Sequence, residues 1–148
     1  MHYHQLQIGE TFISRSSYYV SEQELIEFAQ KWDPQPFHID KQAAKQHQIG
    51  KLFASSVHTI AIATKLAHNN LYFKVDAVAG LGIDELKMLK PVFAGETLSL
   101  KIELIDKRLS KSQPDKGVIT KKMFVTNQDD ELKMTFLSSA LVHVTDEI

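Results

Sequence analysis

The chain contains no cysteine among its 148 residues. This absence excludes disulfides, zinc–thiolate sites, iron–sulfur clusters and catalysis by a thiol nucleophile. It also fits a reducing compartment, so we expect a cytoplasmic protein. Long hydrophobic runs are missing too, because the longest stretch without Lys, Arg, Asp or Glu has thirteen residues, from Leu52 to Thr64. Such a stretch is too short to span a bilayer and fits a buried helix better.

An excess of charge of either sign is also lacking. Seventeen basic and eighteen acidic residues give a net charge of −1, so we expect neither nucleic acid nor an anionic membrane as a partner. The first ten residues, MHYHQLQIGE, have no basic segment followed by an apolar one, and we therefore expect no secretory signal. Hydrophobic residues make up 43% and charged residues 24% of the chain, which is ordinary globular composition. The length predicts a single domain over residues 1–148.

A first helix is expected to begin after Ser21. Ser21 and Glu24 have the S-x-x-E spacing of a capping box. The apolar residues that follow recur with helical periodicity, and they are Leu25, Phe28, Ala29 and Trp32. Asp33-Pro34 ends this helix, since the residue before a proline avoids the α conformation.

Two further helices follow in the first half of the chain. We expect a loop over Pro34–Ile39 and then a short helix around Lys41–His47, with Asp40 as its N-cap. The segment Ala54–His68 carries small or apolar residues on nearly every face. This pattern predicts a helix that is buried on all sides.

The second half of the chain alternates between apolar and polar residues, which is the period of half-buried strands. The predicted strands cover Leu81–Leu89, Leu98–Leu104, Val118–Thr126 and Leu132–Val144. Asn127–Asp130 is a turn that joins the last two strands, and Lys133 and His143 fall on the face opposite the apolar residues of the last one. Helices followed by antiparallel strands predict an α+β fold. A curved antiparallel sheet around one long buried helix, the hotdog arrangement, is one of several α+β folds that this pattern allows.

The segment Asp33–Asp40 places an acid and a histidine in a loop stiffened by Pro34 and Pro36. Asp33 and His38 can face one cavity across this loop, and a catalytic pair needs such stiffness because small displacements of reacting groups are costly. The residues alone leave a structural alternative open, in which Asp33 only ends a helix and His38 only bonds to the backbone.

Six segments carry a family resemblance along the chain. They are Asp33–Asp40 (DPQPFHID), Ala54–Thr59 (ASSVHT), Gly80–Leu86, Pro91–Leu98, Arg108–Gly117 and Asn127–Asp130. Their sequences and their order resemble those of the MaoC-like dehydratases, which are relatives of the (R)-specific enoyl-CoA hydratases. The resemblance runs from Tyr18 to Val144 and implies the hotdog fold, with Arg108–Gly117 as a loop.

The resemblance implies a hydro-lyase that acts on acyl thioesters in fatty acid metabolism. Such an enzyme adds water across the double bond of a trans-2-enoyl thioester, carried by coenzyme A or an acyl carrier, or removes water in reverse. Asp33 and His38 are then the catalytic acid/base pair, sharing one water. No cofactor is implied beyond the coenzyme A thioester as substrate. The resemblance also implies a homodimer, or a multiple of it, with the cleft between subunits.

The start of the buried helix is the expected binding site for the thioester oxygen. By the resemblance this site is Ser55-Ser56-Val57, followed by His58. Backbone N–H groups at a helix N-terminus stabilise negative charge by hydrogen bonding and by the helix dipole. The residues alone also allow plain N-capping by the serines and a hydrogen-bonded core role for His58. Ser56 departs from the family pattern, which has a glycine there that lets a ligand approach the backbone closely.

Other ligand sites find little support in the sequence. We expect no metal, because His58 and His68 fall on different helical faces and His2 and His4 lie at a terminus. We expect no nucleotide or flavin cofactor, because no glycine-rich phosphate loop precedes a helix. Six basic residues between positions 107 and 122 form either a solvated surface or a contact for coenzyme A phosphates.

Two other functions fit the same fold. A hotdog thioesterase would direct water at the carbonyl carbon and release a free acid and a thiol. A non-catalytic module would bind an acyl thioester without turning it over. The products distinguish all three, since only a hydratase leaves an intact 3-hydroxyacyl thioester.

Overall fold

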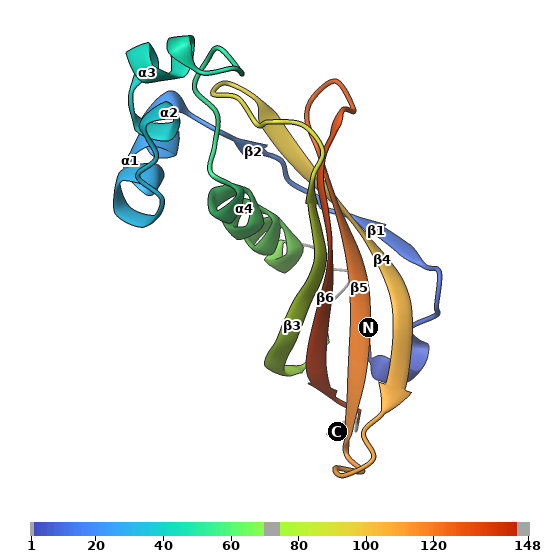
Figure 1. The fold of residues 1–148 in the computed structure, drawn as a ribbon. Helices are drawn as coiled ribbons and strands as arrows, with labels where there is room; N and C mark the ends of the chain where they lie inside the picture. The colour runs from blue at the N-terminus through green and yellow to red at the C-terminus, as the bar shows by residue number, and fades with distance from the viewer. Residues whose placement is uncertain (1, 70–74, 145–148) are drawn as a thin grey trace.

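The computed structural model describes residues 2–69 and 75–144, and its centre is an antiparallel sheet packed against one long helix (Figure 1). The strands are β1 (Thr11–Ile13), β2 (Tyr18–Tyr19), β3 (Ala77–Met88), β4 (Thr97–Leu109), β5 (Lys116–Thr126) and β6 (Leu132–His143). The helices are the 3-10 helix η1 (Tyr3–Gln5), α1 (Glu22–Trp32), α2 (Pro36–Ile39), α3 (Lys41–Gln46) and α4 (Ser56–His68). The strand order is β1-β4-β5-β6-β3, and β2 also pairs with β4. This arrangement confirms the expected α+β hotdog fold.

The core lies between α4 and the sheet. The apolar residues of β4 that alternate in the sequence are all buried, and they are Leu98, Leu100, Ile102 and Leu104. They form one hydrophobic cluster with Ile62 and Leu66 of α4. Burying each of these side chains stabilises the fold by roughly 1.5–3 kcal/mol relative to leaving it exposed. The period-two pattern of β4 therefore identifies the face of the sheet that packs on α4.

The helix α1 begins where its cap predicts. The Oγ of Ser21 accepts a hydrogen bond from the Glu24 N–H at 3.1 Å. The Glu24 carboxylate accepts a hydrogen bond from the Tyr18 hydroxyl of β2. Glu24 therefore ties α1 to the preceding strand.

The segment between α1 and α4 is more helical than expected. The loop expected over Pro34–Ile39 is only partly correct, because Pro36 opens the single turn α2, and proline suits a first helical position. The short helix α3 is confirmed, and the Asp40 carboxylate caps it by accepting the Gln42 N–H at 2.9 Å. In Figure 1 these helices lie together at one end of the molecule, beside the start of α4.

The helix α4 is not buried on all sides within one chain. It begins at Ser56 rather than Ala54, and its buried residues are His58, Thr59, Ile62, Ala63 and Leu66. Val57 is half exposed, and Ala61 and Thr64 are also exposed. The expectation of complete burial is wrong for the single chain, because the sheet and α1 cover only part of the helix. No helix of the described residues is long and apolar enough to cross a membrane.

The edge strand β3 starts four residues before its predicted first residue and ends at Met88. Within the described residues it pairs with β6 alone, and all of its residues are exposed in the single chain. The strands β1 and β2 were not predicted, because they are three and two residues long and carry no measurable alternation.

The basic residues between positions 107 and 122 lie mostly in the β4–β5 hairpin. Arg108 of β4 pairs with Val118 of β5, so only residues 110–115 of the expected loop are outside strands. Lys107 donates a hydrogen bond to the Tyr3 carbonyl at 3.1 Å. Burial lowers the pKa of Lys121. Some of these six basic residues therefore make contacts within the chain, and others lie on the surface. They are not all in one loop.

Candidate active site

Asp33 and His38 are brought together by the end of α1 and the turn α2. Asp33 is the C-cap of α1, and His38 lies in α2 with only 5% of its surface exposed. The Oδ2 atom of Asp33 lies 3.6 Å from the Nε2 atom of His38. The two groups that the sequence singled out therefore face each other in one chain.

The backbone of Phe53 fixes the orientation of the His38 ring. The Nδ1 atom lies 2.6 Å from the Phe53 carbonyl oxygen. A carbonyl oxygen only accepts hydrogen bonds, so the neutral ring carries its proton on Nδ1 and turns the lone pair of Nε2 toward Asp33. The rings of Phe37 and Phe53 contact the imidazole edge to face, with centroid distances of 4.6 and 4.7 Å. Phe53 was not found from the sequence, because its contribution is a backbone atom.

Ser55 fixes the orientation of the Asp33 carboxylate. Its Oγ donates a hydrogen bond to Asp33 Oδ2 at 2.6 Å, and its side chain is almost completely buried. Ser55 is also the N-cap of α4. Ser55 therefore combines the N-capping role that the residues allowed with a contact to Asp33.

The 3.6 Å gap between Asp33 and His38 is too long for a direct hydrogen bond. An ionised carboxylate and the Nε2 lone pair are both acceptors, so they do not bond to each other. A water molecule carries two O–H donors and can donate one to each group. The arrangement is therefore suited to hold a water molecule and to take a proton from it.

The first turn of α4 begins beside this pair. The N–H of Val57 is engaged by the Ser55 Oγ at 3.3 Å, and the Val57 side chain is half exposed. The N–H of Ser56 forms no hydrogen bond within the described part of the chain. Among the residues expected at the thioester oxygen, Ser56 has an N–H that can donate a hydrogen bond to a ligand next to Ser55.

The side chain of His58 has no contact with Asp33 or His38 among the described residues. Its ring is 2% exposed and stacks on Phe28 of α1, with 4.3 Å between ring centroids. Neither ring nitrogen has a hydrogen-bond partner within residues 2–69 and 75–144. The expectation of a hydrogen-bonded core histidine is therefore wrong. The structure also shows no contact of this side chain with Asp33 or His38, so the binding role that the resemblance implies stays a prediction.

Glu24 and Tyr18 form the polar surroundings of His58. Glu24 Oε1 lies 3.8 Å from His58 Nε2. Burial lowers the pKa of His58, and the nearby Glu24 carboxylate opposes this effect. The hydrogen bond to Glu24 raises the pKa of Tyr18 to about 12. Sequence reasoning missed this group because its members come from β2, α1 and α4.

A family model described as a MaoC like domain matches residues 4–127 of the chain. The chain belongs to the MaoC-like dehydratase family. The uncharacterized protein YdeM of Bacillus subtilis is 28% identical to this family member over 123 residues, which cover 83% of this chain and 85% of YdeM.

Solved structures agree with the family assignment. The MaoC-like dehydratase from Rhodospirillum rubrum superposes with a TM-score of 0.91 at 29% identity, and the match covers 99% of both chains. An (R)-hydratase from Pseudomonas aeruginosa superposes with a TM-score of 0.73 at 19% identity, covering 97% of this chain and 86% of the hydratase. The similarity to the (R)-hydratase shows a shared fold and nothing more. Together they place this MaoC-like chain among hotdog proteins that include hydratases and dehydratases.

A metal centre has no candidate in the described part of this MaoC-like chain. Among residues 2–69 and 75–144, no group of three or more His, Asp or Glu side chains is arranged to hold a metal ion.

Proposed function

We propose that this chain catalyses the reversible hydration of a trans-2-enoyl thioester, carried by coenzyme A or an acyl carrier, to a 3-hydroxyacyl thioester. One observation carries the proposal, which is that two oriented acceptors, Asp33 Oδ2 and His38 Nε2, lie 3.6 Å apart. Ser55 and the Phe53 carbonyl hold them in that orientation. The membership in the MaoC-like dehydratases supports the reaction class.

In the proposed reaction, the pair first binds one water molecule by accepting both of its O–H groups. One acceptor takes a proton from the water as its oxygen forms a bond to the β-carbon of the enoyl group. The electron pair of the double bond moves toward the thioester carbonyl, and the α-carbon then receives a proton from the same pair. Water has been added, and Asp33 and His38 return to their starting protonation states. General acid–base catalysis of this kind accelerates reactions by about 10²–10⁴-fold.

Negative charge on the thioester oxygen needs a donor in this mechanism. The N–H of Ser56 supplies it, at the positive end of the α4 helix dipole. The Ser56 hydroxyl is a second donor that the glycine of the family pattern does not offer.

We also infer that two copies of the chain assemble as a dimer along β3. One edge of this twelve-residue strand has no partner strand in the described part of the chain, and its apolar side chains Leu81 and Ile83 are each more than half exposed. Long exposed edge strands pair readily with another strand. Pairing of β3 with a second copy would cover both the edge and these side chains.

The reaction is tested by incubating the protein with a panel of trans-2-enoyl-CoA esters and following the loss of the conjugated absorbance. Product analysis then separates the functions, because an intact 3-hydroxyacyl thioester supports the proposal. Free acid and thiol would instead indicate a thioesterase, and binding without turnover a non-catalytic module.

The catalytic pair is tested by Asp33→Asn and His38→Gln. Each variant keeps the approximate shape of the side chain but loses its acid/base capacity, so kcat should fall by at least about a hundredfold. The double variant should lose little more than either single one, because residues that act as a unit show non-additive losses. Asp40→Asn in the same segment is the matched control and should retain activity. Near wild-type hydration by both single variants would show that the pair is structural.

A further inference from the structure

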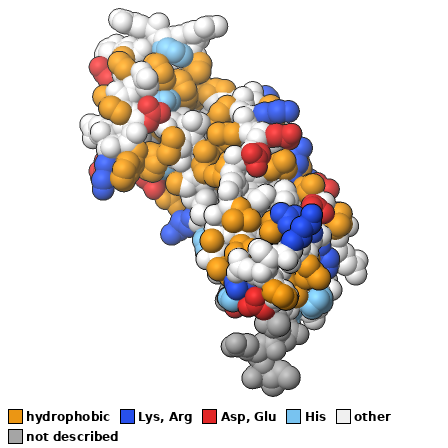
Figure 2. Space-filling view, turned by 60° about the horizontal axis from the view of Figure 1, so that its bottom comes forward, with side chains coloured by type: hydrophobic (Ala, Val, Ile, Leu, Met, Phe, Trp, Pro, Cys, Tyr) orange, Lys and Arg blue, Asp and Glu red, His pale blue; other side chains and the backbone are white. Residues whose placement is uncertain are grey.

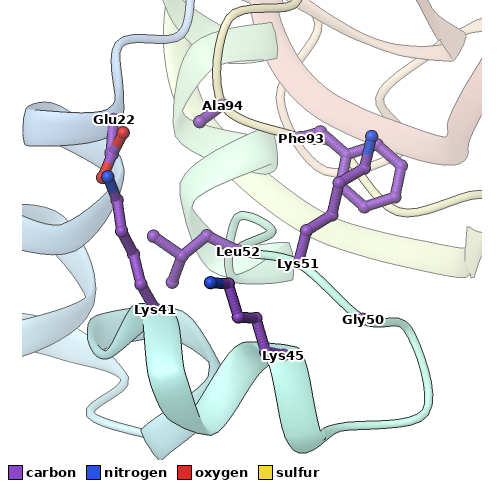
Figure 3. Close-up of a pocket in the computed structure, with 8 residues that line it drawn as sticks. All are labelled: Glu22, Lys41, Lys45, Gly50, Lys51, Leu52, Phe93 and Ala94. Atoms are coloured by element: carbon purple, nitrogen blue, oxygen red, sulfur yellow. The ribbon is translucent and has the colours of Figure 1, made fainter.

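A cavity of about 230 Å³ lies beside the segment that carries Phe53, and we call it the lysine pocket (Figure 3). It lies between the start of α1, the helix α3, and two connecting segments. Its apolar wall consists of Leu52, Phe93 and Ala94, and its charged lining consists of Lys41, Lys45, Lys51 and Glu22. None of these residues takes part in the mechanism described above.

The charge of the lysine pocket is positive and only partly compensated. Lys41 pairs with Glu22 at 2.6 Å. Neither Lys45 nor Lys51 forms an ion pair with any residue that the structure describes, and both are exposed. Figure 3 shows Lys45 reaching toward Leu52, while the Lys51 Nζ lies 3.9 Å from the centroid of the Phe93 ring. Two cations are thus available above an apolar wall.

The backbone that borders the lysine pocket also positions the catalytic pair. Leu52 lines the pocket, and the next residue, Phe53, accepts the hydrogen bond from His38. Phe53 forms a β-bridge with Phe93, which fixes this segment against the opposite wall of the pocket. Leu52 and Ser55 are three positions apart in the chain, a span of at most roughly 10 Å. The lysine pocket and the candidate pair therefore border the same short segment of backbone.

We propose that the lysine pocket binds a phosphate group on the thiol side of the thioester substrate, through Lys45 and Lys51. This inference rests on the proposed function, because an acyl thioester reaches the pocket with the part of the molecule that is not hydrated. Lysine binds phosphate as a compact charge with three donors. Such a phosphate is present both in coenzyme A and in the phosphopantetheine arm of an acyl carrier. Lys41 contributes less, since Glu22 already neutralises it.

The test compares the wild type with a Lys45→Gln/Lys51→Gln double variant on three thioesters of the same trans-2-butenoyl group. The carriers are coenzyme A, 4′-phosphopantetheine and pantetheine, and only the last lacks phosphate. We expect KM for the coenzyme A thioester to rise roughly tenfold or more, with kcat within about twofold of wild type. KM for the pantetheine thioester should not change. Raising the salt concentration should weaken binding of the coenzyme A thioester to the wild type, because the pocket is exposed.

The three carriers also locate the phosphate that is bound. An equal rise in KM for the coenzyme A and phosphopantetheine thioesters assigns the pocket to the phosphate that coenzyme A shares with acyl carriers. A rise for coenzyme A alone assigns it to the other phosphates of coenzyme A. Lys101→Gln is the matched control, since its Nζ lies 4.4 Å from the Phe124 ring centroid outside the pocket. An unchanged KM in the double variant, or an equal rise with pantetheine, overturns the proposal.

Binding of 4′-phosphopantetheine, measured by titration calorimetry, tests the phosphate site independently of the hydratase activity. We expect the double variant to bind it at least about tenfold more weakly than the wild type. Equal affinities overturn the phosphate site even if enoyl thioesters are hydrated. A weaker variant in a protein that hydrates no enoyl thioester supports the phosphate site and overturns only the hydratase.

Discussion

At the scale of single residues, the environment of each histidine decides what it can do. His38 and His58 are both almost completely buried, yet only His38 has a hydrogen-bond partner among the described residues. The hydrogen bond to the Phe53 carbonyl leaves the Nε2 lone pair of His38 directed at Asp33. His58 instead stacks on Phe28, where it is a buried imidazole with unused polar atoms. Leaving such atoms without a partner costs stability when the ring is buried.

The burial of His58 predicts a pH-dependent stability. Burial lowers its pKa in the folded protein, whereas the unfolded chain has the ordinary value of about 6.5. The unfolded state therefore binds the proton first as the pH falls. The stabilising contribution of neutral His58 to the free energy of unfolding is fully present above pH ~6.5. It is lost as the pH decreases below this value, by at most about 1.4 kcal/mol per pH unit. Urea unfolding at a series of pH values between 8 and 5.5 (~0.5 steps) measures this slope.

His58→Phe isolates the effect, because phenylalanine retains the stacking on Phe28 and does not titrate. The free energy of unfolding of this variant should vary less with pH than that of the wild type. His68→Gln at the exposed end of α4 should leave the slope unchanged. If His58→Phe and the wild type have the same slope, His58 is not a source of the pH dependence.

At the scale of elements, the connection between β3 and β4 is fixed by a buried lysine. Lys133 of β6 lies opposite the core face, as predicted, yet only 2% of its surface is exposed. Its Nζ lies 2.8 Å from Glu96 Oε1 and 3.1 Å from the Pro91 carbonyl. Asn127 donates a further hydrogen bond to Glu96 at 3.1 Å. The connection that carries Phe93 and Ala94 of the lysine pocket is thereby attached to the sheet.

Lys133→Met should destabilise the protein strongly. The variant leaves the Glu96 carboxylate buried without its cation, and breaking a buried pair in this way costs about 3–5 kcal/mol. The midpoint of urea unfolding should fall accordingly. Adding Glu96→Gln should recover part of the loss, because the remaining group is then neutral.

An exposed ion pair near the start of β6 is the control for the buried pair of Lys133 and Glu96. Lys90 and Glu131 are also 2.8 Å apart, but both side chains are largely exposed. Exposed pairs contribute at most about 1 kcal/mol, so Lys90→Met should change the midpoint little. Similar losses in Lys90→Met and Lys133→Met would contradict the importance of burial.

At the scale of the whole molecule, the single chain leaves much apolar surface in contact with solvent. Figure 2 shows hydrophobic side chains exposed on one face, interspersed with charged ones. The exposed residues include the apolar side chains of β3 and Val57 of α4. Exposed apolar side chains along the edge of a long strand are typical of an interaction site. In the proposed dimer, a second copy of the chain pairs along β3 and covers these side chains.

The dimer is tested by light scattering at micromolar concentration. We expect the wild type to have twice the mass of one chain and a Leu81→Lys/Ile83→Lys variant to shift toward the mass of one chain. Lysine at these positions places like charges on both copies and opposes edge pairing. Leu109→Lys, at a similarly exposed position at the end of β4, should leave the mass unchanged. A wild type that is strictly monomeric would contradict the assembly.

The sequence by itself determined the elements whose signals are local. The Ser21 and Asp40 caps and the alternation of Leu98–Leu104 predicted helix starts and a strand correctly, since caps and periodicity depend only on neighbouring residues. The motif around Asp33 and His38 is also local, but the residues alone left a structural role open, and the family resemblance singled out the candidate pair. The distance between these two side chains, the proton position on His38 and its contact with Phe53 were decided by tertiary structure alone. The same holds for His58 and for the lysine pocket, because their partners lie on separate elements and only packing brings them together.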